Sequence, residues 1–423
     1  MFQGLSLEQA PPYKIPLRFY ITGGVYLVML GVLSLLYAPS LESRYSYEAI
    51  ALTHTLTIGF FSHVMFGSMF QIIPVMLGIA YKNVVRNANI IYAMLNVGIV
   101  FFLIGFLTHT LAMLHIGGSV LLGGFLYFGY LSFSTVFESV EKDFLVQNFA
   151  ASFALLFLGS IFGFIALLGH SGFVSSIKFG AIHIALMLFG WVFILVNAVS
   201  YKIIPMFFVA KEFPEILKRW LYVAVIVFLF GLIYFRLGDD YVATHIMLVL
   251  LSGCVILFAT MSIWILKNRK RARRDLSVDL WYFAMANIIA AACLIPVDNF
   301  FEKDLSLFIA FFGLFGGIYA LINAMLYKIV PFLTWFHLSS SMVFEAEMSQ
   351  VIPKDAMQKQ VYLYFFSYGA FVVSFFWTFA LILGSILFIA SSLLLLRNII
   401  QAQRYYNEYI KKKVDMADFA PSV

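Results

Sequence analysis

Eight histidines are the residues of this chain best suited to chemistry. Most lie in or beside long apolar segments, where an imidazole without a partner is costly and so indicates a functional site. Neutral imidazoles bind haem iron and copper. The alternative role is hydrogen bonding to a backbone carbonyl or a Tyr or Thr hydroxyl inside a helix bundle. The candidate haem or copper ligands are His54, His183 and His63, and the further candidate metal ligands are His115 and His245.

Signatures of other chemistry are missing from the sequence. No carboxylate lies well inside an apolar segment, which disfavours a proton pump or a cation symporter. The glycine clusters follow no strand and precede no Lys-Ser/Thr pair, so they are not phosphate loops. Cys254 and Cys293 lie in apolar segments and are predicted to be packing residues. The basic cluster at 269–274 is expected to anchor a loop at the membrane, and no nucleic-acid partner is predicted.

A sixteen-residue pattern occurs three times, at 59–74, 190–205 and 316–331. It reads Gly, ten residues, Phe or Tyr, Gln or Lys, Ile, Ile or Val, Pro. The small residue lets a neighbouring helix approach closely, and the proline removes one helical hydrogen bond. The lysines are expected to extend towards the membrane surface. The structural positions of the pattern are Gly59 and Pro74; Gly190, Tyr201, Lys202 and Pro205; and Gly316, Tyr327, Lys328 and Pro331.

The composition indicates an all-α polytopic membrane protein, because 63% of residues are apolar and 11% are charged. The repeats predict one transmembrane domain, 1–423, built from three pseudo-symmetric groups of four helices at 17–136, 147–266 and 278–402. A cytoplasmic tail is expected at 403–423. The twelve predicted spans are 17–38, 50–80, 88–108, 112–136, 147–169, 178–210, 217–237, 242–266, 278–297, 305–335, 360–379 and 381–402.

The basic residues predict the orientation. With a cytoplasmic N-terminus, 21 Lys and Arg fall on the inner side, 4 fall in outer loops and 2 lie inside spans. By the positive-inside rule both termini are therefore expected in the cytoplasm, and a prokaryotic inner membrane is the predicted location. The apolar spans are predicted to contact the lipid bilayer.

The spacing between two of the histidines and the glycines that follow them resembles that of a known protein family. His183 stands seven residues before Gly190-Trp191, with Tyr201 and Pro205 following, and His54 stands five residues before Gly59. With twelve spans in three groups of four, the chain resembles subunit I of the heme-copper oxidase superfamily, in its cytochrome cbb-type and nitric oxide reductase branches. The resemblance implies that His54 occupies the position of an axial haem ligand near the outer face.

The chain departs from that family at the dinuclear centre. The span at 217–237 has no histidine, Ile309 and Phe311 occupy the two ligand positions before Gly316, and no two histidines are adjacent. Oxygen reduction is therefore not expected. The NnrS proteins, many-spanned haem and copper proteins of nitric oxide metabolism, are a more distant analogue.

Two functions follow from the sequence. In the first, the protein binds haem or copper near the outer face and acts in electron transfer, haem or metal handling, or nitrogen-oxide metabolism, with respiratory or periplasmic redox proteins as partners. In the second, it is a cofactor-free transporter or an assembly subunit of a respiratory membrane complex.

Overall fold

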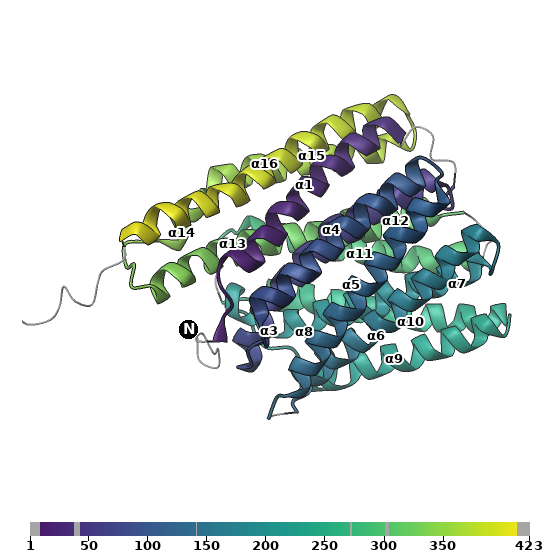
Figure 1. Ribbon diagram of the computed structural model, residues 1–423, viewed down its shortest axis with the longest axis horizontal. Coiled ribbons are helices and arrows are strands. Elements are labelled where there is room, and N and C mark those ends of the chain that lie inside the picture. Colours follow the sequence, from purple (N-terminus) through teal and green to yellow (C-terminus); the bar gives the residue numbers. More distant parts are fainter. Residues whose placement is uncertain (1–8, 38–42, 141, 271–272, 301–303, 413–423) are drawn as a thin grey trace, which may run out of the picture. The chain divides into compact units, whose positions relative to one another are not determined.

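The protein is an all-helical membrane protein. The computed structural model describes residues 9–37, 43–140, 142–270, 273–300 and 304–412, and these contain no strand. Within them, eleven helices are long and apolar enough to cross a bilayer (Figure 1). The predicted class, an all-α polytopic membrane protein, is confirmed at this level.

The helices follow one another with short connections. The first half of the chain contains α1 (Lys14–Tyr37), α2 (Tyr47–His54), η3 (Thr55–Ser62), α3 (His63–Leu77), α4 (Val84–Leu107), α5 (Leu111–Phe137), α6 (Phe144–Leu168), η4 (Gly169–Ser171), α7 (Ser176–Ala185), η5 (Leu186–Phe193) and α8 (Ile194–Phe208). The second half contains α9 (Glu215–Leu237), α10 (Tyr241–Lys267), α11 (Leu276–Phe300), α12 (Ser306–Ala310), η6 (Phe311–Tyr319), α13 (Ala320–Ser340), α14 (Met348–Val351), α15 (Lys354–Ser374), α16 (Phe379–Tyr409) and η7 (Ile410–Lys412).

Eleven of the predicted spans overlap these apolar helices, ten of them with ends that agree to within five residues. The predicted span at 360–379 corresponds to α15, which is helical but less apolar and is not among the eleven. The turn before α16 lies at 375–378, and α16 continues past the predicted end at 402 to Tyr409. Of the predicted tail, residues 413–423 lie outside the described residues.

Acidic and hydroxyl side chains begin several of the helices. The Asp143 carboxylate accepts hydrogen bonds from the backbone amides of Leu145 and Val146, each at 3.0 Å, at the start of α6. The Asp240 carboxylate accepts from the Ala243 amide at 2.9 Å at the start of α10. Such caps satisfy amides that have no partner within the helix.

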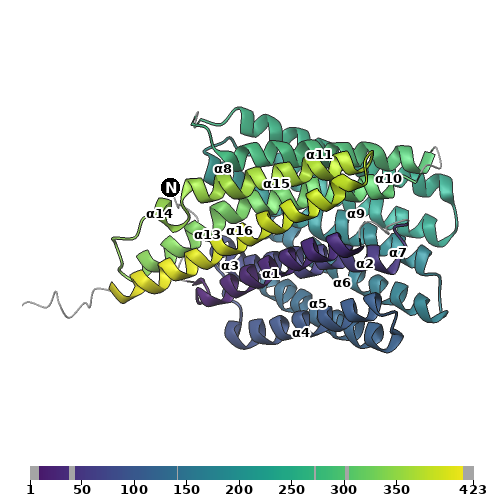
Figure 2. The same ribbon diagram turned by 90° about the horizontal axis from the view of Figure 1, so that it is seen from above.

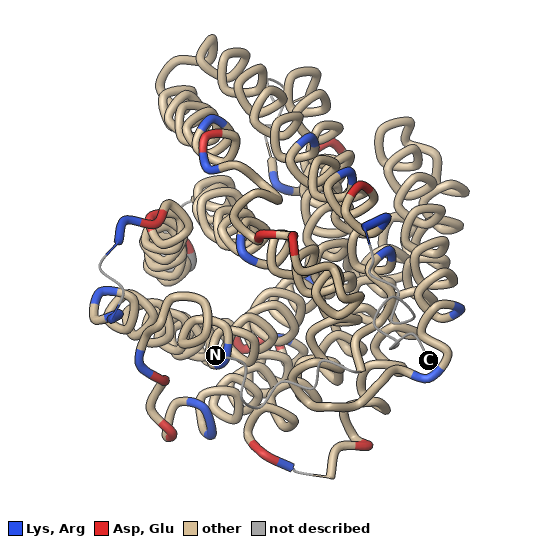
Figure 3. The backbone as a smooth tube through the Cα atoms, turned by 90° about the vertical axis from the view of Figure 1, so that its left-hand side faces the viewer, with Lys and Arg blue, Asp and Glu red and all other residues tan. Residues whose placement is uncertain are grey.

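The few charged residues stand out against a chain that is mostly tan (Figure 3).

Contacts divide the chain into two compact units. The first unit comprises the described residues of Met1–Pro11, Glu42–Ala51 and Ser68–Leu321. Within it, helices that are neighbours in sequence pack together, notably α4 with α5, α5 with α6, and α10 with α9 and α11 (Figure 1). The second unit comprises the described residues of Pro12–Leu41, Leu52–Gly67 and Ile322–Val423. Within it, α16 packs against both α15 and α1 (Figure 2).

Glycines set the distance between α4 and α5 in the first unit. A Cβ atom added at Gly117 would collide with backbone atoms of Phe102 and would lie 2.8 Å from the Gly98 carbonyl oxygen. A Cβ atom at Gly105 would lie 2.5 Å from the Leu114 amide nitrogen. The two helices therefore touch backbone to backbone, which is how small residues hold helices together in membranes.

A buried polar network joins three helices of the second unit. The Gln360 side chain donates to the Ser391 hydroxyl at 2.9 Å, and its carbonyl oxygen accepts from Asn323 at 3.3 Å. The Asn398 amide donates to the Tyr327 hydroxyl at 2.9 Å. All five side chains are buried. Gln360, one of the polar residues that make α15 less apolar, thus faces its neighbours α13 and α16, where it is hydrogen-bonded.

Replacing Gly117 with alanine is expected to destabilise the protein by about 1–3 kcal/mol, because the methyl group forces α4 and α5 apart. Gly253→Ala is the matched control, since nothing lies within 4 Å of a Cβ atom there. The control should be neutral or gain up to about 1 kcal/mol from helix propensity. The stability of both variants is measured by thermal unfolding in the same detergent. Equal stability of the two would contradict this description of the interface.

Candidate functional site

Each copy of the repeated pattern contains a π-helical segment at the same place. The segments are η3, η5 and η6, and they include Gly59, Gly190 and Gly316 respectively. Such segments are rare and occur frequently at functional sites, because the wider turn leaves backbone groups for other partners. The repeat therefore specifies a local backbone conformation as well as a sequence, which the sequence pattern alone did not reveal.

His183 is held against the neighbouring helix of the first unit. Its Nδ1 lies 2.8 Å from the carbonyl oxygen of Gly159 on α6. A Cβ atom at Gly163 would lie 2.6 Å from the same nitrogen, so the glycine makes room for the ring. A carbonyl oxygen can only accept, so Nδ1 carries the proton, and in the neutral ring Nε2 holds the lone pair. This is the tautomer in which most metal-bound histidines are fixed.

His63 has the same arrangement in the second unit. Its Nδ1 lies 3.0 Å from the Ile58 carbonyl oxygen, five residues earlier, in the π-helical segment. The ring is fully buried, with the Tyr26 ring centroid at 5.3 Å and the Phe19 centroid at 6.1 Å. As in His183, a backbone carbonyl sets the tautomer and leaves Nε2 as the basic nitrogen.

The other predicted ligands have separate surroundings. His115 on α5 places its Nε2 2.7 Å from the Ser171 hydroxyl oxygen. His54 ends α2, and His245 lies on α10, both half-buried. His54 belongs to the second unit and His183, His115 and His245 to the first. Among the described residues, no group of three or more His, Cys, Asp or Glu side chains is arranged to hold one metal ion.

The structure brings together a cluster that sequence spacing did not predict. Tyr47 at the start of α2 stacks on His109, with ring centroids 4.7 Å apart, and its hydroxyl lies 3.1 Å from Nδ1 of His170. Glu48 lies 3.8 Å from Nε2 of His109. These residues come from three separate turns of the first unit. The only sequence signal was that both histidines lie at span ends.

The repeat positions themselves are mainly packing residues. A Cβ atom at Gly59 would lie 2.8 Å from the Tyr26 side chain, and one at Gly190 would lie 3.0 Å from Leu155. Side chains of this protein therefore fill those two glycine faces. The Tyr201 hydroxyl donates to the Leu217 carbonyl at 3.3 Å. The prolines lie inside continuous helices, namely Pro74 in α3, Pro205 in α8 and Pro331 in α13.

A buried ion-pair cluster fixes the start of α9 in the first unit. The Lys218 ammonium donates to Glu212 at 2.9 Å and to Glu215 at 2.7 Å, although only 3% of the lysine side chain is exposed. It also lies 4.9 Å from the centre of the Phe144 ring. Two carboxylates thus compensate one buried cation, which a single partner would do less completely.

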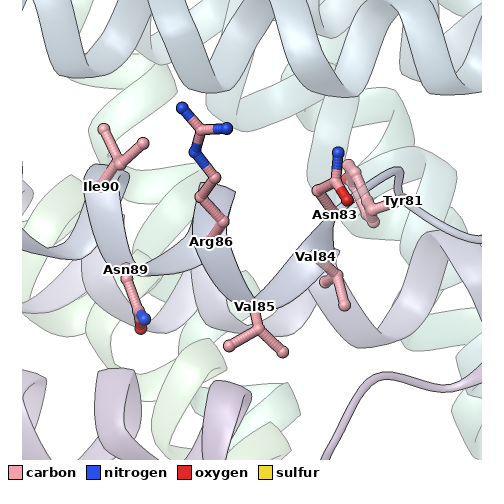
Figure 4. Close-up of a pocket in the computed structure, with 7 residues that line it drawn as sticks. All are labelled: Tyr81, Asn83, Val84, Val85, Arg86, Asn89 and Ile90. Atoms are coloured by element: carbon pink, nitrogen blue, oxygen red, sulfur yellow. The ribbon is translucent and has the colours of Figure 1, made fainter.

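A groove of about 820 Å³ follows the start of α4. Arg86 and Asn89, which line it, point to opposite sides of the helix (Figure 4). These two polar side chains therefore do not point towards a common position where a ligand could bind, and the groove is an uneven part of the surface.

No protein-family model and no curated protein matches this chain. The histidines can therefore be tested only against the chemistry of the groups they are predicted to bind. Axial ligation of haem needs one or two imidazoles with a basic Nε2, and His183 and His63 have the required tautomer. The donor atoms of the two residues are therefore chemically suited to be ligands of haem iron.

The cluster at Lys218 predicts a pH dependence. The hydrogen bond and charge of Lys218 hold the pKa of Glu212 below its usual value. The pair therefore stabilises the folded protein above the ordinary glutamate pKa, and this contribution is lost as the pH falls through the lower folded-state pKa. Glu212→Gln should flatten the fall in unfolding free energy between pH 6 and pH 3 by roughly 0.5 kcal/mol, since the carboxylate is largely exposed.

Glu408→Gln is the control for this titration, since Glu408 is exposed and interacts with Lys412 only at a distance, without forming a salt bridge to a described residue. If both variants follow the wild-type curve, the Lys218 cluster does not contribute as described.

Proposed function

We propose that the chain folds as three groups of four spanning helices, the architecture of an oxidase-like subunit I. Support comes from the three π-helical segments, which share their position relative to Gly59, Gly190 and Gly316. In this architecture α15 is the eleventh span in chain order and brings the total to twelve. Its 21 residues suffice to cross a core of about 30 Å, and its polar side chains bond to α13 and α16.

The position of α15 is testable by labelling. In a variant without Cys254 and Cys293, a cysteine at Thr378, in the turn between α15 and α16, should react with a membrane-impermeant maleimide from the outer side only. A cysteine at Lys354 should react from the inner side only. Reaction of both positions from one side would mean that α15 does not cross the membrane.

The function that we infer is haem binding by imidazole within the membrane, with a role in electron transfer or haem handling and not in oxygen reduction. The observation that carries it is the His183 hydrogen bond, in which Nδ1 is tied to the Gly159 carbonyl across two helices. Such a bond orients the ring and makes Nε2 the more basic nitrogen. His63 offers the same chemistry, and the oxidase resemblance adds His54. Bound haem would supply one-electron chemistry, while the chain holds the imidazole and excludes water.

The experiment is an absorption spectrum with haem and copper analysis of protein purified from cells supplied with both. Wild-type protein is expected to show a Soret band, and His183→Ala should lose most of it while keeping its folded yield. His109→Ala is the control, since this ring lies in an exposed turn, with 62% of its side chain accessible. A band that is unaffected by His183→Ala would exclude this ligand.

If wild-type protein carries neither haem nor copper, the result would contradict the proposal that it binds a cofactor. The cofactor-free alternative, a transporter or an assembly subunit, would then replace it. One observation favours that alternative: side chains fill the glycine faces at Gly59 and Gly190.

A further inference from the structure

A groove of about 470 Å³ runs along one face of α16 in the second unit. Its lining changes in character along the helix. Leu393, Leu396 and Ile400 are apolar. The polar residues Arg397, Gln401 and Arg404 lie nearer the C-terminal end of the lining. Spacings of three, four and seven residues place these side chains on one side of the helix.

The two arginines lie where the hydrocarbon ends. Arg397 is eighteen residues after Phe379, where α16 begins, or about 27 Å along the helix axis. A bilayer core is about 30 Å thick, so Arg397 is near its boundary and Arg404, two turns further, lies among the headgroups. Leu393, with 49% of its surface exposed, remains in the hydrocarbon.

No described residue neutralises either guanidinium. Both arginines are exposed, and among the described residues neither has a hydrogen-bond or ion-pair partner. Two other cations of the second unit are paired, Lys359 with Asp355 and Lys412 with Glu345. Two uncompensated cations beside an apolar groove at this depth attract an anion that also has an apolar part.

We propose that this groove binds an anionic phospholipid. An acyl chain lies along Leu393, Leu396 and Ile400, and the headgroup phosphates accept hydrogen bonds from Arg397 and Arg404. The arginines are about 10 Å apart along the helix, which favours a headgroup with two phosphates, as in cardiolipin. Guanidinium groups bind phosphate oxygens in pairs, so a lysine at either position would be a weaker substitute.

The test measures cardiolipin binding to the purified full-length protein by the shift in its thermal unfolding. Cardiolipin should raise the unfolding temperature further as its concentration exceeds the dissociation constant. Arg397→Gln with Arg404→Gln should weaken the binding about thirtyfold. Arg219→Gln, which removes an exposed arginine paired with Glu215, should leave it unchanged. Leu393→Trp, which fills the apolar end of the groove, should also weaken it while retaining both charges.

Further arms identify the ligand. Phosphatidylcholine and inorganic pyrophosphate, tested separately, should each give a much smaller shift, because one lacks the net charge and the other the acyl chains. The proposal is overturned if the double arginine variant, folded and monodisperse, binds cardiolipin as wild type does. It is also overturned if pyrophosphate alone reproduces the full shift, since the site would then recognise a free anion.

Discussion

A polar group placed in the hydrocarbon of a membrane is costly unless it finds a partner within the protein, and this constraint shapes much of the chain. Backbone groups meet it by forming helices. Side chains meet it by pairing across helices, as Gln360 does with Ser391 and Asn398 does with Tyr327. Where two helices touch closely, as at Gly117, glycine removes the side chain altogether. The buried Lys218 meets the same requirement with two carboxylates.

The histidines obey this constraint in a way that suits ligation. His183 and His63 each give their Nδ1 proton to a backbone carbonyl, which satisfies one nitrogen and defines the chemistry of the other. His115 instead pairs through Nε2 with Ser171. The hydrogen bonds of these three histidines therefore involve different ring nitrogens.

The all-helical membrane class and the approximate positions of the spans could be predicted from the sequence, because apolar length is a local property of the chain. The weak point was α15, whose hydropathy is lowered by the exposed charged residues Asp355 and Lys359 and by Gln360, which bonds to Asn323 and Ser391. The π-helical segments were not predicted, because helical periodicity does not distinguish an i+5 turn from an i+4 turn. The Tyr47, His109 and His170 cluster was also missed, because three distant turns form it. Spacing identified which histidines to consider, but the hydrogen-bond partners of His183 and His115 come from segments distant in sequence.

The central claim is that His183 is oriented by the Gly159 carbonyl so that its Nε2 can ligate haem. A density map of the protein purified with haem, obtained in a lipid environment, tests it most directly. The account predicts planar density within bonding distance of Nε2, with Nδ1 still on the Gly159 carbonyl. A map of haem-loaded protein in which the His183 ring contacts only protein atoms would contradict the claim.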